Sequence, residues 1–205
     1  MTALKPHRSA WFTGLLLLAA TALANVPEAS SDEPLEPDSR HEKIGEVVTQ
    51  FIQKSHYRHV ALDDELSTNV MDRYIESLDR NRMYLLQSDI EYFEQFRYEL
   101  DDIVRSRTKS LEPVFDMFSI YRTRVRDRFE FALTQLEKEP DLLISEDYQF
   151  DRTEAPWAAS QDELDEIWRK RVKNDYLRLK LTDKEPEAIV ETLSDRYDNL
   201  ERRIT

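Results

Sequence analysis

The sequence predicts an all-α protein of about six amphipathic helices, arranged as a bundle or as two lobes. Apolar residues recur every three or four positions from residue 40 onward. The 205 residues include only two glycines, Gly14 and Gly45, whereas tight hairpins and phosphate-binding loops depend on glycine. Several Ser/Thr-x-x-Glu strings, typical of helix starts, precede the apolar runs.

Composition limits the possible functions. Hydrophobic residues make up 40% and charged residues 35%, which is too apolar for a disordered chain and too polar for a membrane protein. The net charge of −13 repels phosphates, so a nucleic-acid partner is not expected. The absence of cysteine excludes disulfides, thiolate zinc sites and a cysteine nucleophile. No metal or other cofactor is predicted.

The N-terminus has the pattern of a secretory signal peptide. A basic start precedes the apolar run Trp11–Ala20, and Ala22-Leu23-Ala24 forms a small-x-small end. Residues 1–24 are therefore predicted as a signal peptide that is cleaved after Ala24. The uncharged stretch 9–24 is slightly short for a membrane span, and an uncleaved anchor is the alternative. The mature chain is expected to be exported to the periplasm of a Gram-negative-type envelope, without stable membrane insertion.

Residues 25–39 are rich in proline, acids and serine, and predict a disordered leader before a helical domain over 40–205. The first helix is expected over His41–Lys54 and the second over Asp63–Asp79. The apolar stripe of the first helix comprises Ile44, Val47, Val48, Phe51 and Ile52.

A capping box at Ser88–Glu91 opens a predicted third helix, Ser88–Arg105. The fourth is predicted over Glu112–Leu136, because Pro113 is tolerated in a first turn and the apolar spacing continues to Leu136. Pro140 ends this helix.

Residues 141–156 show no helical period and predict a long polar-aromatic connection. A box at Ser160–Glu163 opens the fifth helix, which extends to Leu179, and a box at Thr182–Glu185 opens the sixth, which extends to Ile204. The chain stops at Thr205 with this helix still in register and without a glycine or proline stop. We expect truncation of a longer protein; a frayed natural end is the alternative.

No catalytic or metal-binding residue is predicted. His56 and His59 have a spacing compatible with two metal ligands, but no further ligands complete a site. Ser106 and Lys109 resemble a Ser/Lys dyad, yet no nearby glycine exposes oxyanion donors. Acidic pairs occur on polar helix faces, where their carboxylates are expected to be solvated rather than perturbed; they are Asp63-Asp64, Asp101-Asp102, and Glu163 with Asp165 and Glu166.

A basic run on the fourth helix comprises Arg122, Arg124, Arg126 and Arg128. Residues two apart point to different sides of a helix, so a stripe for an anionic partner is disfavoured. We expect these arginines to pair with local acids such as Asp127 and Glu130.

Four aromatic residues are candidates for a protein interface: Tyr148, Phe150, Trp157 and Trp168. The first three lie on or beside the non-helical connection, where partner contacts are common. The alternative is that they are loop aromatics packed on the helical core.

Short strings of residues are more specific than the composition and the helical periodicity. They run in order through the chain: Ser55-His-Tyr-Arg-His59, Leu62, Asp72-Arg-Tyr74, Leu78-Asp79, Met83, Leu85-Leu86, Ser88-Asp89, Phe93, Asp151-Arg152, Ala155-Pro-Trp157, Glu163-Leu164, Ile167-Trp168, Leu177 to Thr182, Arg196-Tyr197 and Arg202-Arg203. Their order and spacing resemble the N-terminal helical domain of the tail-specific, or carboxy-terminal processing, proteases, over about His41–Thr205.

The resemblance implies a periplasmic serine endopeptidase with a Ser/Lys dyad, in which a PDZ domain captures apolar C-terminal tails of exported proteins. Those parts are absent from the 205 residues, so no catalytic residue is carried over. The helices are implied to form a clasp around the protease core, to assist substrate access, and to offer a surface for a helical-repeat adaptor. The alternative is a free-standing periplasmic helical adaptor or inhibitor-like module. An independent acid–base enzyme is the weakest interpretation.

Overall fold

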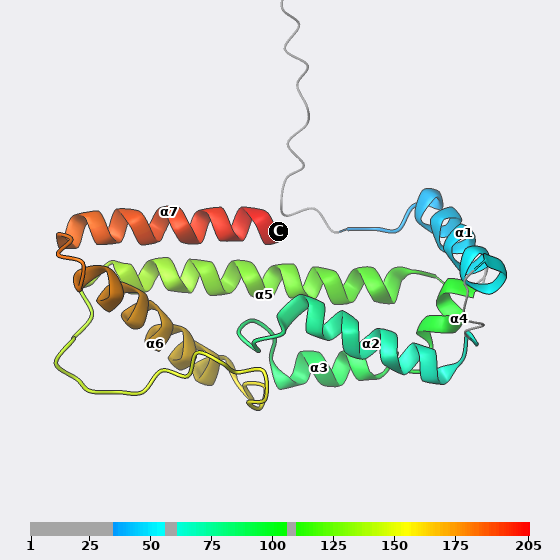
Figure 1. Ribbon diagram of the computed structural model, residues 1–205, viewed down its shortest axis with the longest axis horizontal. Coiled ribbons are helices and arrows are strands. Elements are labelled where there is room, and N and C mark those ends of the chain that lie inside the picture. Colours follow the sequence, from blue (N-terminus) through cyan, green and yellow to red (C-terminus); the bar gives the residue numbers. More distant parts are fainter. Residues whose placement is uncertain (1–34, 56–60, 106–109) are drawn as a thin grey trace, which may run out of the picture. The chain divides into compact units, whose positions relative to one another are not determined.

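In the computed structural model, residues 35–55, 61–105 and 110–205 are described, except for the side chains at positions 52, 53 and 55. These residues form seven α-helices (Figure 1), and a single parallel bridge between Leu86 and Ala158 is their only β-pairing. The all-α prediction is confirmed. Three predictions lie outside the described residues: the signal peptide with most of the leader, the pair His56 and His59, and the pair Ser106 and Lys109.

Four of the predicted helices have close counterparts. They are α1 (Ser39–Ser55), α2 (Asp64–Asp79), α5 (Glu112–Leu136) and α6 (Gln161–Lys180). At the start of α2, the backbone N–H of Leu66 donates to the Asp63 carboxylate at 3.0 Å, which satisfies one of the free donors of the first turn.

The predicted third helix is two helices, α3 (Gln87–Glu94) and α4 (Leu100–Arg105). The prediction of one helix over Ser88–Arg105 was wrong because Ser67 of α2 binds at the break. Its hydroxyl donates to the carbonyl of Arg97 at 2.7 Å and accepts from the N–H of Leu100 at 2.9 Å. Turns over residues 95–99 replace the helical hydrogen bonds there.

Of the three predicted capping boxes, only the one at Ser160 forms in part, because Ser160 is the N-cap of α6 but Glu163 reaches the residue before it rather than the Ser160 N–H. The N–H of Glu163 donates to the Ser160 hydroxyl at 3.2 Å, and the Glu163 carboxylate accepts from the N–H of Ala159 at 2.8 Å. At α3 the first residue is Gln87, the N-cap is Leu86, and Asp89 accepts from the Leu86 N–H. The Ser88 box is therefore wrong.

The last box is also wrong, because Thr182 lies in the turn that follows α6 and does not start α7 (Pro186–Ile204). Its hydroxyl donates to the carbonyl of Leu179 at 2.7 Å. Asp183 adopts a left-handed conformation with φ of 58°, which turns the chain between the two helices. Glu185 is the N-cap of α7 and makes no side-chain capping bond.

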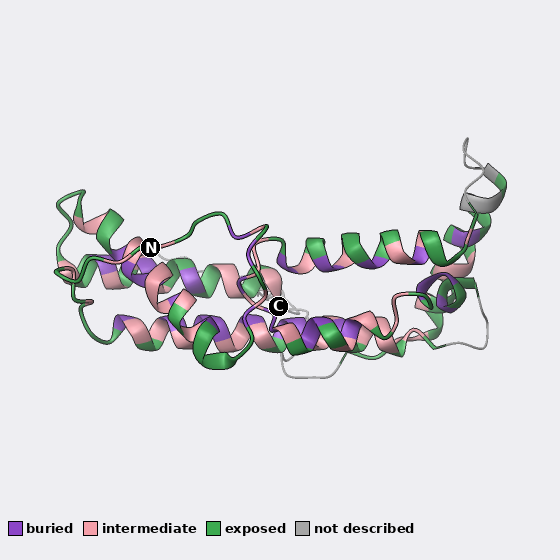
Figure 2. Ribbon diagram, turned by 90° about the horizontal axis from the view of Figure 1, so that it is seen from below, coloured by how far each residue is buried: buried purple, intermediate pink, exposed green. Residues whose placement is uncertain are grey.

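One continuous core joins α2 to α7, which favours a bundle over two lobes. Helices α6 and α7 pack against α5 and against each other. Rings at the centre meet at favourable aromatic distances: Phe129 lies 5.4 Å from Trp168 and 6.0 Å from Tyr197, and Tyr84 lies 5.7 Å from Trp168. The buried positions recur along one face of the helices (Figure 2).

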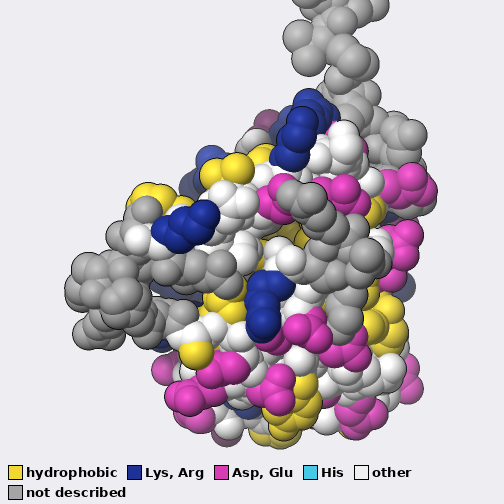
Figure 3. Space-filling model, turned by 90° about the vertical axis from the view of Figure 1, so that its right-hand side faces the viewer, with side chains coloured by type: hydrophobic (Ala, Val, Ile, Leu, Met, Phe, Trp, Pro, Cys, Tyr) yellow, Lys and Arg dark blue, Asp and Glu magenta, His cyan; other side chains and the backbone are white. Residues whose placement is uncertain are grey.

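Helix α1 is the exception, because the structure leaves its apolar stripe uncovered. The helix packs on α4, where the hydroxyl of Thr49 donates to the Val104 carbonyl at 3.4 Å. Figure 3 views the end that carries α1 and α4 and shows hydrophobic side chains at the surface among charged ones. The exposed stripe consists of Ile44 at 60%, Val47 at 66%, Val48 at 47% and Phe51 at 62% exposure.

Candidate functional site: a groove beside the α5–α6 connection

The connection between α5 and α6 is pinned to the helices at several points. Near its start, the ammonium of Lys173 donates to the Ile144 carbonyl at 2.8 Å and pairs with Glu146 at 2.6 Å. Arg169 also pairs with Glu146. Hydrogen bonds from Arg169 and Lys173 lower the pKa of Glu146 to about 2, so this carboxylate is charged at neutral pH and holds the connection against α6.

A second clamp comes from Asn81, in the loop that follows α2. Its amide donates to the carbonyl of Phe150 at 3.0 Å and accepts from the N–H of Arg152 at 2.8 Å. Arg82, which has a φ of 51°, donates to the carbonyl of Ala155. One loop thus fixes the backbone of the connection on both sides of residue 151.

The loop after α2 is itself held by a buried carboxylate. Asp79 is 3% exposed and accepts three backbone N–H bonds, from Met83 at 2.8 Å, Tyr84 at 2.8 Å and Leu85 at 2.9 Å. Burial raises the pKa of Asp79, and the three N–H donors oppose that rise. Asp79 was noted in the sequence only within the family strings.

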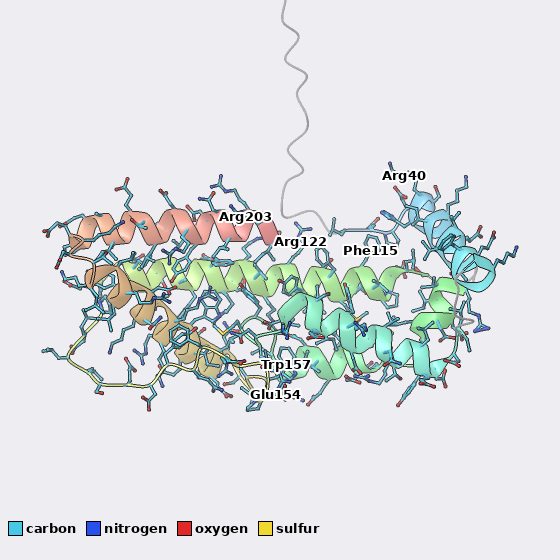
Figure 4. All side chains as sticks on the ribbon, viewed as in Figure 1. Arg40, Phe115, Arg122, Glu154, Trp157 and Arg203 are labelled. Carbon is cyan, nitrogen blue, oxygen red and sulfur yellow. The ribbon has the colours of Figure 1, made fainter. Side chains whose placement is uncertain are left out.

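The structure separates the four predicted interface residues. Tyr148 and Phe150 form an edge-to-face pair with centroids 4.8 Å apart, and Phe150 is 57% exposed. Trp157 lies under the guanidinium of Arg82, 5.2 Å from the ring centroid, near Glu154 on the connection (Figure 4). Trp168 is fully buried and donates its indole N–H to the Met83 carbonyl at 2.5 Å. The assignment of Trp168 to an interface was therefore wrong; binding by the other three stays a prediction.

Tyr148 and Phe150 line one side of a groove of about 460 Å³. Its other walls come from the loop after α2, from α6 and from α7. Three arginines reach it from these elements: Arg80, Arg171 and Arg196. The groove therefore combines the half-buried ring of Tyr148 and the exposed ring of Phe150 with these three arginines and with the carboxylates of Asp79 and Asp175.

The acidic pairs considered for catalysis have structural roles. Asp63 and Glu163 cap helices, Asp101 pairs with Arg105 at 3.1 Å, and Glu166 pairs with Arg169 at 2.7 Å. In the part of the chain that the structure describes, no group of three or more His, Asp or Glu side chains is placed to hold a metal ion.

Two arginines of the run on α5, Arg124 and Arg128, pair with acids of other helices. Arg124 binds Asp89 of α3 through two hydrogen bonds of 2.8 and 3.0 Å, and the buried Arg128 pairs with Asp165 of α6. For these two arginines, the expected pairing with local acids was wrong. They tie α5 to its neighbours instead of forming a surface stripe.

These features define a helical domain that has an exposed apolar stripe on α1 and a groove beside the α5–α6 connection. The family model described as "Tail specific protease N-terminal domain" matches residues 48–205, and the chain belongs to this family. A "Tail-specific protease" of Haemophilus influenzae is 34% identical over 198 residues, covering 95% of this chain and 28% of that relative. The chain thus spans 28% of the length of this curated relative. The predicted family is confirmed.

Proposed function

We propose that the chain is the non-catalytic N-terminal domain of a periplasmic tail-specific serine endopeptidase, where it supports the protease and substrate access. The enzyme would degrade or process exported proteins from apolar C-termini. The observation that carries the proposal is the uncovered apolar stripe of α1 on a chain that spans 28% of a tail-specific protease.

The α1 stripe is a large apolar surface to leave in water. Burying one such side chain fully contributes about 1.5–3 kcal/mol, and four side chains are each about half or more exposed. Covering them would therefore release on the order of 5 kcal/mol. We propose that the PDZ and protease region of the complete enzyme packs on this stripe, since contiguous apolar patches on a domain commonly mark an interface.

The periplasmic assignment rests on the signal-peptide pattern of residues 1–24. Among the helices in the described ranges, none is long and apolar enough to cross a bilayer. Protein substrates with apolar tails would engage the PDZ and protease part, and a helical-repeat adaptor protein is a further proposed partner.

Reading the coding sequence past Thr205 tests this proposal. It should continue into a PDZ domain and a protease domain with a Ser/Lys dyad. A stop codon directly after Thr205 would contradict the proposal and favour the free-standing adaptor or inhibitor-like module.

A further inference from the structure

The turns over residues 95–99 break a helix that the local sequence favours. Residues 94–99 contain neither glycine nor proline, and the Gln, Arg and Glu among them are strong helix formers. Several N–H groups of this stretch donate to the carbonyl three residues back, at 3.0–3.3 Å, as in a 3₁₀-helix; they belong to Gln95, Phe96, Arg97 and Glu99. Bonds of this type inside a helical stretch often mark a hinge.

Helix α2 supplies the hydrogen bonds that maintain the break. The Ser67 hydroxyl donates to the Arg97 carbonyl at 2.7 Å and accepts from the Leu100 N–H at 2.9 Å. In a continuous α-helix, these two backbone groups would bond instead to the N–H of Asp101 and the carbonyl of Phe96. One side chain of α2 therefore replaces two hydrogen bonds that the helix would make by itself.

The Arg97 side chain is a second tie between the break and α2. It donates to the Asp72 carboxylate at 2.7 Å and to the Thr68 carbonyl at 3.5 Å, and it also pairs with Glu94 of α3. Helix α2 thus holds residue 97 through both its backbone and its side chain. Removing the backbone tie should favour the helix that the local sequence prefers.

Helix α1 packs on α4, which follows the break. The Thr49 hydroxyl donates to the Val104 carbonyl at 3.4 Å, and near the start of α1 the His41 ring meets the Phe115 ring of α5 edge-on, with centroids 5.1 Å apart. In Figure 1, α4 runs across the direction of α3. A continuous helix would carry α4 along the direction of α3, and α1 would move with it.

We propose that residues 95–99 are a hinge with two states. In the state that the structure shows, Ser67 and Arg97 hold the break; in the other, Gln87–Arg105 is one helix and α4 has swung with α1. The second state is populated at about 1% or more. The swing redirects the α1 stripe, but the hinge belongs to this chain alone, so its test needs no protease and can fail independently of the proposed function.

Distances between two spin labels on the full chain measure the two states by pulsed electron resonance. The chain has no cysteine, so Gln50→Cys on α1 and Glu91→Cys on α3, both exposed positions, can be labelled specifically. This labelled chain should give one main distance. Adding Ser67→Ala leaves the backbone groups at the break without their partner, and should raise the second state about tenfold, to about 10% or more of the molecules.

Ser77→Ala is the matched control. Ser77 is an exposed serine of the same helix, and its hydroxyl donates to the Tyr74 carbonyl within α2 at 2.7 Å. Its removal should leave the distance distribution of the labelled chain unchanged.

A zinc clamp tests whether the second state is helical across the break. Two histidines at i and i+4 bind one Zn²⁺ on a helix, and Gln95→His with Glu99→His places such a pair at exposed positions. In the Ser67→Ala chain, Zn²⁺ should raise the second distance about tenfold in its equilibrium constant, to about half of the molecules. Glu130→His with Thr134→His lies within α5, which is helical in both states, and Zn²⁺ there should change nothing.

The clamp also works in the chain that keeps Ser67, where Zn²⁺ should raise the second state to about 10%, so the test does not depend on the folding of Ser67→Ala. A second distance that appears in Ser67→Ala, grows with Zn²⁺ at 95 and 99, and is absent from both controls would support the proposal. The proposal is overturned if Ser67→Ala keeps the original distribution, if Ser77→Ala changes it equally, or if Zn²⁺ at 95 and 99 does not increase the second distance. The last result would mean that α4 opens by local unfolding.

Discussion

Asp79→Ala should be strongly destabilising, because it removes the acceptor of three backbone N–H bonds in a buried loop. A hydrogen bond to a charged group contributes about 1.5–3 kcal/mol. Burial of the carboxylate, which raises the pKa of Asp79, offsets part of that sum. The expected net loss in the free energy of unfolding is about 3–4 kcal/mol.

For a domain of this size, about 1 kcal/mol shifts the melting temperature by about 2–4 °C, so Asp79→Ala should melt roughly 10 °C lower. Circular dichroism at a helical wavelength during heating, together with urea unfolding, measures both quantities. Asp79→Asn keeps one acceptor oxygen and should lose roughly half as much. A decrease in the melting temperature of less than about 3 °C for Asp79→Ala would refute the reasoning, because water would then be satisfying the three backbone N–H groups of the loop.

Three further substitutions test other parts of the structure. Trp168→Phe deletes the indole N–H bond to the Met83 carbonyl and should cost about 2–3 kcal/mol in urea unfolding; a loss under about 0.5 kcal/mol would count against a core role. Because the folded pKa of Glu146 is about 2, below its usual 4.5, its stabilisation is complete above pH 4.5 and is lost as pH falls toward 2. Melting curves of wild type and Glu146→Gln should therefore converge over that window, and a constant difference would contradict the assignment. Phe51→Ser, at a position 62% exposed, should change stability by less than about 1 kcal/mol and reduce binding of an apolar dye; strong destabilisation would mean that α1 is covered.

Helical periodicity predicted most of the fold because amphipathic spacing depends only on local sequence. The break between α3 and α4 did not follow from it. Phe93 and Leu100 are both buried and keep the apolar pattern across the break, while the group that interrupts the helix, Ser67, lies 30 residues away from its acceptor Arg97. The local sequence pattern does not predict a hydrogen bond between two residues that lie 30 positions apart in the chain.

The candidate site was predicted in part. The aromatic pair Tyr148 and Phe150 was identified from its place on a non-helical connection. The arginines opposite it come from three separate elements, and only folding brings them together. Likewise, the stripe of α1 was visible as an apolar pattern, but periodicity alone does not distinguish a stripe that faces the core from one that remains open.

The central claim is that these 205 residues support a protease without performing its chemistry. A peptidase assay of the purified chain tests it most directly, using an unfolded reporter protein with an apolar C-terminus and the Haemophilus influenzae tail-specific protease as the positive control. The account predicts cleavage by the control and none by the chain. Cleavage by the chain that a single substitution within residues 35–205 abolishes would contradict it.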